Sequence, residues 1–186
     1  MQGVHAVTVS PVVIPVLETA RFVLRGHTLA DFDASAAMWG DPAVTRFIGG
    51  RPFTSDEVWA RILRYHGHWA LLGFGFWAIE DRATGQFIGE VGFADFRRPI
   101  EPPFGDTPEM GWSLAAAAHG NGVASEVVAA AAAWGDANFT HDRTVCIIAP
   151  ENGASIRVAE KSGFGEVRRT DYHGSSTIVF ERRRGG

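Results

Sequence analysis

The second half of the sequence alternates between strand-like and helix-like patterns, and this order restricts the possible fold more than any other feature. Residues 109–114 and 144–149 are short runs typical of strands, and a helical, alanine-rich pattern over 123–137 separates them. A second helix is expected over 152–163, because asparagine caps helix starts and glycine suits the residue after a last turn. Two further strands are expected at about 164–171 and 177–182, joined by a turn that contains Gly174.

The first half supplies antiparallel strands and two more helices. Helices are predicted from Thr28 to about Gly40 and from Thr54 or Ser55 onward, where Val58, Ile62, Tyr65 and Trp69 recur at spacings of three and four. The predicted strands are 21–25, 75–80 and 86–93, and the proline-rich segment 97–108 allows neither helix nor strand. The order predicts a mixed α/β fold, with a mostly antiparallel sheet and helices on both faces.

Length, charge and cysteine content limit the class of protein. The chain has 186 residues, which suits one domain, and we expect an N-terminal extension over 1–16 and a single domain over 17–186. A net charge of −4 argues against a protein held to nucleic acid by phosphate contacts. No run approaches the ~20 apolar residues that cross a bilayer. A single cysteine cannot form an internal disulfide, so nothing indicates an oxidising compartment. From these two observations we expect a cytoplasmic protein without membrane partners.

The segment His119-Gly120-Asn121-Gly122-Val123-Ala124 lies between a predicted strand and a predicted helix. Its glycines allow a tight turn and close approach of a ligand, and free amides at the helix start favour phosphate. For two glycines alone, a plain turn that begins a helix is the favoured interpretation. A P-loop would need a Gly-Lys-Ser/Thr triplet, and a dinucleotide fingerprint would need glycine in place of Ser125. The segment therefore predicts a phosphate site outside these two families.

Several segments together resemble the GNAT acetyltransferases, and specifically their RimJ/RimL-like branch. His119–Ala124 resembles the family's pyrophosphate loop, Gln/Arg-x-x-Gly-x-Gly/Ala, with His119 as a departure from the expected Gln or Arg. The resemblance extends over about residues 17–182. Its other segments are Leu17-Glu-Thr-Ala-Arg-Phe-Val-Leu-Arg25, Glu109-Met-Gly-Trp-Ser-Leu114 and Asn152-Gly-Ala-Ser-Ile-Arg-Val-Ala-Glu-Lys-Ser-Gly-Phe164.

The resemblance implies the GNAT fold and acetyl-CoA as co-substrate. It implies binding of the coenzyme by three groups of residues: the loop His119, Gly120, Asn121, Gly122, Val123 and Ala124; the strand residues Trp112, Ser113 and Leu114; and the helix-start residues Asn152 and Ser155. Because the loop works mainly through backbone amides, we expect it to bind the coenzyme despite His119.

Glu109 is the candidate general base. Along a strand, Glu109 shares one face with Gly111 and Ser113, so an apolar face of Met110, Trp112 and Leu114 could pack on a helix while Glu109 points into a cleft. In similar enzymes a glutamate here removes the proton of the attacking amine. The alternative is a solvated glutamate at the start of a strand.

Asn152 and Ser155 lie three residues apart at a helix start, and capping alone would explain Asn152. The resemblance adds that both approach the pantetheine arm. Many GNAT enzymes have a tyrosine in place of Ala159 that protonates the thiolate of coenzyme A, and in the RimJ/RimL-like branch a serine at Ser155 can replace it. Ser155 is therefore the candidate acid.

Other residues favour structural interpretations. Cys146 lies in a buried run and is expected to be inert, and His66 and His68 point to different sides of a helix, so no metal site is predicted. Core packing is favoured for the aromatic cluster Trp69, Phe74, Phe76 and Trp77, near the family's acceptor pocket. Glu90, Asp95, Glu101 and Asp106 could attract a protonated amine or form a charged solvent face, and Arg182–Arg184 reads as a solvated tail.

The sequence thus predicts an N-acetyltransferase that moves acetyl directly from acetyl-CoA to a primary amine, on a protein N-terminus or a small molecule. A non-catalytic acyl-CoA-binding module and, more remotely, a nucleotide-binding protein are the alternatives. The expected partner is the amine acceptor, with no nucleic acid, and the protein is expected to be a monomer or homodimer.

Overall fold

One eight-stranded sheet organises the structure, a computed structural model that describes residues 12–186. The strand order is β1-β2-β3-β4-β5-β6-β8-β7, and every neighbouring pair is antiparallel except β5 and β6, which are parallel. The strands are β1 (Leu17–Glu18), β2 (Phe22–Arg25), β3 (Phe76–Asp81), β4 (Phe87–Ala94), β5 (Glu109–Leu114), β6 (Arg143–Ile148), β7 (Gly165–Tyr172) and β8 (Ser175–Arg183).

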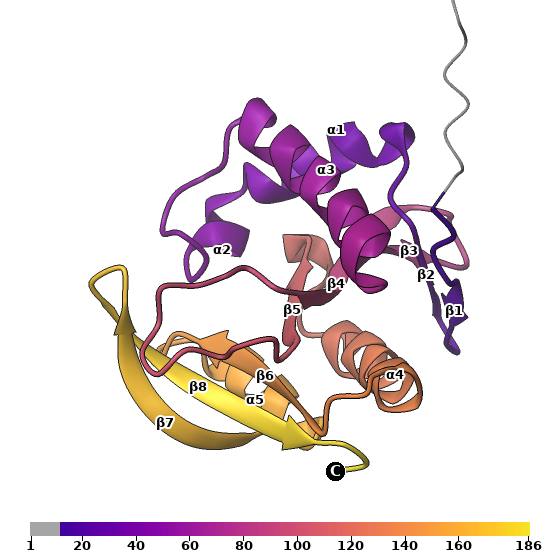
Figure 1. Cartoon of the computed structure of the whole chain (residues 1–186). Coiled ribbons are helices and arrows are strands. Elements are labelled where there is room, and N and C mark those ends of the chain that lie inside the picture. Colours follow the sequence, from indigo (N-terminus) through magenta and orange to yellow (C-terminus); the bar gives the residue numbers. More distant parts are fainter. Residues whose placement is uncertain (1–11) are drawn as a thin grey trace, which may run out of the picture.

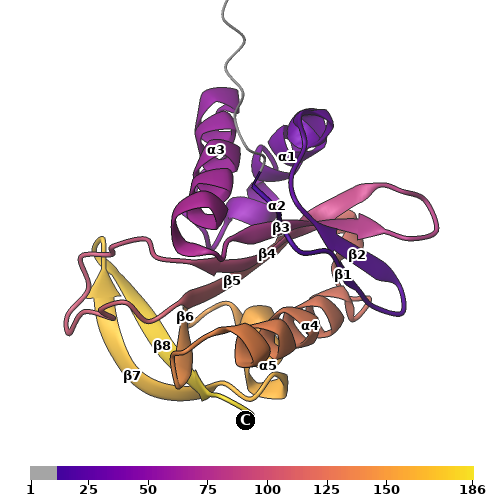
Figure 2. The same cartoon turned by 45° about the vertical axis from the view of Figure 1, so that its right-hand side comes forward.

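Helices cover both faces of the sheet (Figures 1 and 2). One face carries α1 (Phe32–Trp39), α2 (Pro42–Thr45) and α3 (Ser55–Leu72), and the other carries α4 (Val123–Asn138) and α5 (Gly153–Lys161). Short 3-10 turns span Leu29–Asp31 and Ala116–Ala118. The predicted mixed α/β fold with helices on both faces is confirmed. No helix within residues 12–186 has the length and apolar character needed to cross a bilayer.

Helix α3 follows its sequence pattern closely. The Glu57 carboxylate accepts a hydrogen bond from the Thr54 amide at 2.9 Å, which satisfies a free donor at the helix start. The predicted stripe is buried, with exposed fractions of 5% or less at Val58, Ile62, Tyr65 and Trp69. Gly73 ends the helix with φ of +73°, a conformation that glycine adopts without steric cost.

The alternation of side chains on β5 separates a polar face from an apolar one. Met110 and Leu114 join the core against α4. Glu109, Gly111 and Ser113 point the other way, and Ser113 is paired with Glu90 of β4. Because Glu90 contacts side chains of α1 and α3, the Glu109 face of β5 is the face that these helices cover. The predicted division of this strand is confirmed.

The sheet divides between β5 and β6. These strands share only the register pair Glu109–Val145, whereas β4 and β5 are paired along six residues of each strand. Beyond Glu109 the two strands diverge, and β6 continues through six residue pairs with β8. The backbone on either side of the division is therefore free to line a cleft.

Some features differ from the sequence expectation. The two-residue strand β1 and the four-residue helix α2 are too short to produce a periodic signal. On α4, Ala130 and Trp134 are only partly buried, and the fully covered residues are Val123, Val127, Val128, Ala131, Ala132 and Gly135. An alanine-rich helix has little polar contrast, so its sequence does not define the buried face. Residues 1–11 of the expected N-terminal extension lie outside the described residues.

The prediction of a solvated tail at Arg182–Arg184 is wrong for Arg182. This side chain is buried on β8, and its guanidinium donates to both carboxylate oxygens of Asp136 on α4, at 2.6 and 2.8 Å. It also donates to the Ser162 and Gly186 carbonyl oxygens. Because Arg182 lies in a mostly buried strand, pairing of β8 with β6 places its side chain against the rest of the protein.

Candidate active site

A cleft of about 770 Å³ opens where β5 and β6 diverge. Its floor is formed by residues 109–113 of β5 and residues 146–149 around the end of β6. Asn152 and Ser155, at the start of α5, line one part of it. The segment 46–50 after α2, together with Trp39, Arg61 and Tyr65 from α1 and α3, lines another. A cavity of this size can hold a small ligand.

Glu109 lies in this cleft at the point where the strands separate. The side chain is 6% exposed, and Arg98 of the proline-rich loop holds it: Nε donates to Oε2 at 2.6 Å and Nη2 donates to Oε1 at 2.8 Å. The remaining Nη1 of Arg98 donates to the Tyr172 hydroxyl at 2.9 Å. The alternative of a solvated strand-start glutamate is therefore wrong, since the carboxylate is oriented and sheltered from water.

Opposing effects act on this carboxyl group. Burial raises the pKa of Glu109, because the charged form loses its hydration, while the hydrogen bonds and positive charge of Arg98 oppose the increase. The pKa lies above the ordinary glutamate value. A raised pKa makes a carboxylate a stronger proton acceptor, which is what general-base catalysis near neutral pH requires.

The predicted phosphate loop sits at the start of α4. Gly120 and Gly122 have φ of +80° and +72°, so both positions need glycine to avoid strain. Gly122 is the cap residue and has no side chain to satisfy the helix start. Within the described residues, the first helix amide with an internal acceptor is that of Glu126, which donates to the Gly122 carbonyl oxygen at 3.3 Å. The preceding amides remain available to an anion.

Two side chains fix the shape of this loop. Arg21, the residue before β2, donates to the Asn121 carbonyl oxygen at 3.0 Å and pairs with Glu126 at 2.8 Å, so its side chain anchors the loop to α4. His119, the departure from the family pattern, contacts the Leu114 carbonyl oxygen through Nε2 at 3.0 Å. Its ring closes the turn that follows β5 and leaves the loop amides free.

Asn152 caps α5, since its side-chain oxygen accepts from the Ser155 amide at 3.2 Å. The capping interpretation of Asn152 is confirmed. Both side chains also line the cleft, and Ser155 is half-buried there. Ala159, one helical turn further on, is fully buried, and its methyl side chain offers no hydroxyl to the cleft.

The structure brings part of the predicted site together. Glu109, Trp112, Ser113, Asn152 and Ser155 line the cleft. Leu114 is buried in the core at the end of β5, and the loop residues His119, Gly120, Asn121, Gly122, Val123 and Ala124 follow it without lining the cleft. The loop is therefore a separate subsite, joined to the cleft through β5.

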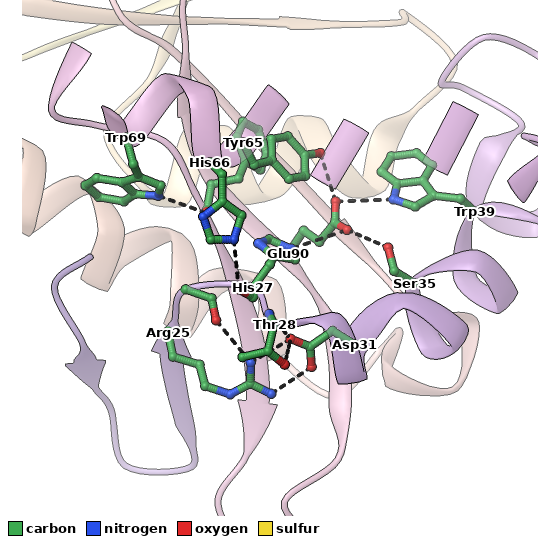
Figure 3. A network of polar contacts seen from close by, with 12 residues as sticks. Arg25, His27, Thr28, Asp31, Ser35, Trp39, Tyr65, His66, Trp69 and Glu90 are labelled. Atoms are coloured by element: carbon green, nitrogen blue, oxygen red, sulfur yellow. Dashed lines mark hydrogen bonds and ion pairs between the residues drawn. The ribbon is translucent and has the colours of Figure 1, made fainter. Parts of the chain in front are cut away.

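A buried polar network lies beside the cleft, where Glu90 is 0% exposed (Figure 3). Its carboxylate accepts from the Ser35 hydroxyl at 2.9 Å, the Tyr65 hydroxyl at 2.8 Å and the Trp39 indole at 3.2 Å, and His27 Nε2 lies 3.5 Å away. Burial alone would raise the pKa of Glu90, but the contacts with His27 and Tyr65 and the charge of Arg61 hold it below its ordinary value.

For Glu90, a charged solvent face is thus the wrong interpretation. Its ionised carboxylate is fully enclosed, and Trp39 and Tyr65, which it holds, line the cleft. Among the aromatic cluster, only Phe76 lines the cleft, while Trp69, Phe74 and Trp77 pack in the core.

The cysteine and histidines considered from the sequence have structural roles. Cys146 is 1% exposed, and burial raises the pKa of its thiol far above the ordinary value, so it stays protonated. His66 and His68 contact different carbonyl oxygens, those of His27 and Asp95. Residues 12–186 hold no cluster of three His, Cys, Asp or Glu side chains that could bind a metal ion.

Sequence reasoning missed Arg98, Arg61 and Tyr65, which line the cleft together with Glu109. Arg98 lies in a loop without periodic pattern, and Arg61 and Tyr65 lie on a helix where four-residue spacing also suits packing. Glu90 did carry a usable signal: it is the single charged residue in the strand Phe87–Ala94. A charge within an apolar strand indicates a buried, partnered group.

Comparisons with known proteins identify the family to which this fold belongs. The acetyltransferase (GNAT) domain family matches residues 21–165, which is most of the chain. This protein therefore belongs to the GNAT acetyltransferase family.

Three relatives resemble the chain over most of its length. An uncharacterized N-acetyltransferase, YoaA, of Bacillus subtilis is 29% identical over 151 residues, covering 81% of this chain and 82% of the relative. The solved structure of a putative GNAT-family acetyltransferase from Bordetella pertussis is 34% identical, covers 91% of this chain and 99% of its own, and has a TM-score of 0.80. An acetyltransferase structure from Agrobacterium tumefaciens is 26% identical, with coverage of 97% and 99% and a TM-score of 0.79.

A more distant structure shares the fold alone. It is RimL, a ribosomal L7/L12 α-N-protein acetyltransferase solved with coenzyme A, at 15% identity, 91% and 98% coverage and a TM-score of 0.73.

Proposed function

We propose that this protein transfers acetyl from acetyl-CoA directly to a primary amine within a ternary complex, with Glu109 as general base. The observation that carries the proposal is the position of the Glu109 carboxylate, sheltered in the cleft at the point where β5 and β6 separate. The domain of this activity spans residues 17–186, and its placement in the RimJ/RimL-like branch belongs to the proposal. The single buried thiol suits the cytoplasm, the proposed location.

The coenzyme is proposed to bind in two parts. The free amides after Gly120 and at the start of α4 suit the diphosphate, as anions bind at helix N-termini. Trp112, Ser113 and Leu114 of β5 and Asn152 and Ser155 of α5 would then flank the pantetheine arm and the thioester. The diverging β5 leaves backbone amides beside the cleft that can stabilise the oxyanion.

The reaction follows from this placement. The amine nitrogen attacks the thioester carbonyl carbon, its proton passes to the Glu109 carboxylate, and the carbon–sulfur bond breaks. The departing thiolate takes a proton from the Ser155 hydroxyl in this scheme, after which Ser155 regains a proton from solvent and Glu109 releases the one it took from the amine. Because the amine attacks directly, no acyl-enzyme forms, in agreement with the protonated, buried state of Cys146.

Replacement of the proposed base tests the activity. Glu109→Gln is expected to lower kcat by about 10²- to 10⁴-fold, since proton removal contributes that much, and to leave the calorimetric affinity for acetyl-CoA unchanged. Released coenzyme A is measured with a thiol reagent across a panel of amines and peptides. Glu160→Gln, at an exposed position on α5, is the matched control and should keep full activity.

Two outcomes would count against the proposal. An unchanged rate for Glu109→Gln would remove Glu109 from the mechanism. Acetyl-CoA binding without turnover of any amine would favour the alternative, a non-catalytic acyl-CoA-binding module.

A further inference from the structure

The part of the cleft beneath α1 and α3 is where an acceptor amine must lie. The loop at the start of α4 is on the opposite face of the sheet from these helices (Figure 2). Glu109, in contrast, points to the α1–α3 face, together with Gly111 and Ser113. A coenzyme bound at the α4 loop therefore leaves the α1–α3 side for the molecule whose proton Glu109 removes.

This side of the cleft carries positive charge without carboxylate partners. Arg61 of α3 and Arg46 after α2 both line the cleft, and neither forms an ion pair within residues 12–186. Of the two carboxylates that line the cleft, Glu109 has both oxygens held by Arg98, and Glu151 is exposed in the turn before α5.

Arg61 is held in place yet lacks a hydrogen-bond acceptor. Its guanidinium carbon lies 3.8 Å from the centre of the Trp39 ring and 5.9 Å from that of Tyr65. Its Nε is buried and has no hydrogen-bond partner among the described residues. A buried hydrogen-bond donor without an acceptor costs free energy. A ligand that supplies an acceptor to this nitrogen would remove that cost.

Glu90 cannot be that acceptor. It lies behind Trp39 and Tyr65, and its oxygens are already occupied by Ser35, Trp39 and Tyr65, with His27 close by (Figure 3). Its negative charge still favours a guanidinium nearby. Glu90 thus fixes the two aromatic rings against which Arg61 stacks, and leaves the donors of Arg61 free for the cleft.

We propose that Arg61 and Arg46 form an anion subsite, and that the acceptor is a small amine that also carries a carboxylate. This inference rests on the proposed acetyl transfer and names its substrate class. A guanidinium binds a carboxylate through paired, charge-assisted hydrogen bonds, which place the amine of the same molecule toward Glu109. The same two charges disfavour polycationic amines.

Matched pairs of acceptors test the subsite. The rates of acetylation of free amino acids are compared with those of their carboxamides, of polyamines, and of peptides with an acidic second residue. We expect kcat/KM to favour each amino acid over its carboxamide by about tenfold or more, the value of one charged hydrogen bond. The peptide series tells whether a side-chain carboxylate can replace the α-carboxylate. A carboxamide or polyamine accepted as well as the acid would overturn the proposal.

Arginine variants connect the preference to the subsite. Arg61→Met and Arg46→Met should each reduce the acid-to-amide ratio about tenfold to a hundredfold, mainly through KM. Arg46 is exposed, so its replacement leaves the core intact. Arg64→Met is the matched control, because Arg64 is on the same helix but does not line the cleft. An unchanged ratio in both Arg61→Met and Arg46→Met would overturn the proposal.

A binding measurement separates this inference from the activity itself. The protein loaded with coenzyme A is titrated with N-acetyl amino acids and with their carboxamides in a calorimeter. Tighter binding of the acids, lost in Arg61→Met, would support the subsite even if no turnover were found and the proposed function failed. Equal binding of acid and amide, or no binding of either, would refute it.

Discussion

At the scale of single residues, the site depends on the contacts between Arg98 and Glu109. Arg98 holds both oxygens of Glu109 and also bonds Tyr172, so the loop 95–108 and strand β7 together orient the carboxylate. Burial raises the pKa of Glu109 and Arg98 opposes that increase. Arg98 is therefore a positioning residue whose removal should change proton affinity as well as geometry.

The pH dependence of Arg98→Met follows from the sign of these effects. Without the guanidinium, burial and the charge of Asp95 act unopposed, so the pKa of Glu109 rises further and less of the base is ionised at neutral pH. The acidic limb of the profile of kcat/KM against pH should move to higher pH, with partial recovery of activity in alkali. The same acceptor is used for parent and variant, so that its own titration cancels.

Arg169→Met is the control for this experiment, because the Arg169 side chain is 60% exposed and pairs with Glu166, away from Glu109. Its profile should match the parent. A limb that stays in place in Arg98→Met, with only a lower rate, would mean that Arg98 acts on geometry alone.

At the scale of secondary-structure elements, a buried carboxylate joins two helices to the sheet. Glu90 of β4 binds Ser35 and Trp39 of α1 and Tyr65 of α3, so the α1–α3 layer is attached to the strand beside β5 (Figure 3). Each donor would be unsatisfied without it. The position of the cleft wall therefore depends on a polar contact as well as on apolar packing.

Glu90→Ala should lower the free energy of unfolding by about 3–5 kcal/mol, as expected when one partner of a buried charged network is removed. Ser35→Ala, which removes one hydrogen bond, should cost about 1 kcal/mol, and the exposed Glu160→Ala should change stability by less than about 0.5 kcal/mol. Urea unfolding measures all three. A loss in Glu90→Ala no larger than that in Ser35→Ala would show that the network adds little to stability.

Elements with strong local signals could be predicted from the sequence, and long-range polar contacts could not. Strand β5 and helix α3 were predicted because alternation and three-to-four spacing are local properties. Gly120 and Gly122 predicted the tight turn before α4, where both residues have the positive φ values that glycine adopts without strain. The contact between Arg98 and Glu109 joins residues eleven positions apart, and Arg61 contacts Trp39 only after two helices pack. Such pairings depend on tertiary structure, so no local pattern reveals them.

At the scale of the whole molecule, the two parts of the sheet meet at a single register pair of β5 and β6, and other contacts must keep the second part in place. Arg182 of β8 supplies one of them. It binds Asp136 of α4, the Ser162 carbonyl oxygen after α5 and the Gly186 carbonyl oxygen. The C-terminal strands are thereby attached to the helix whose start forms the proposed diphosphate site.

Arg182→Met should therefore lower the free energy of unfolding by about 2 kcal/mol at neutral pH, because it removes the charged hydrogen bonds to Asp136, whose carboxylate is partly exposed and keeps the Gly185 amide as a donor. The hydrogen bond from Arg182 is the main cause that holds the pKa of Asp136 below its ordinary value. A lowered pKa gives stability that is present above the ordinary aspartate pKa and is lost as the pH falls through the folded value. The difference between parent and variant should consequently shrink in acid.

The neighbouring Arg184→Met is the matched control, since that side chain is exposed and donates only to the His141 carbonyl oxygen. It should change stability by less than about 0.5 kcal/mol at any pH. Urea unfolding of the three proteins at neutral and acidic pH measures both effects. If Arg182→Met and Arg184→Met cost the same, the C-terminal strands are held by the β6–β8 register alone, and the pair with Asp136 has no part in keeping the α4 side of the cleft in place.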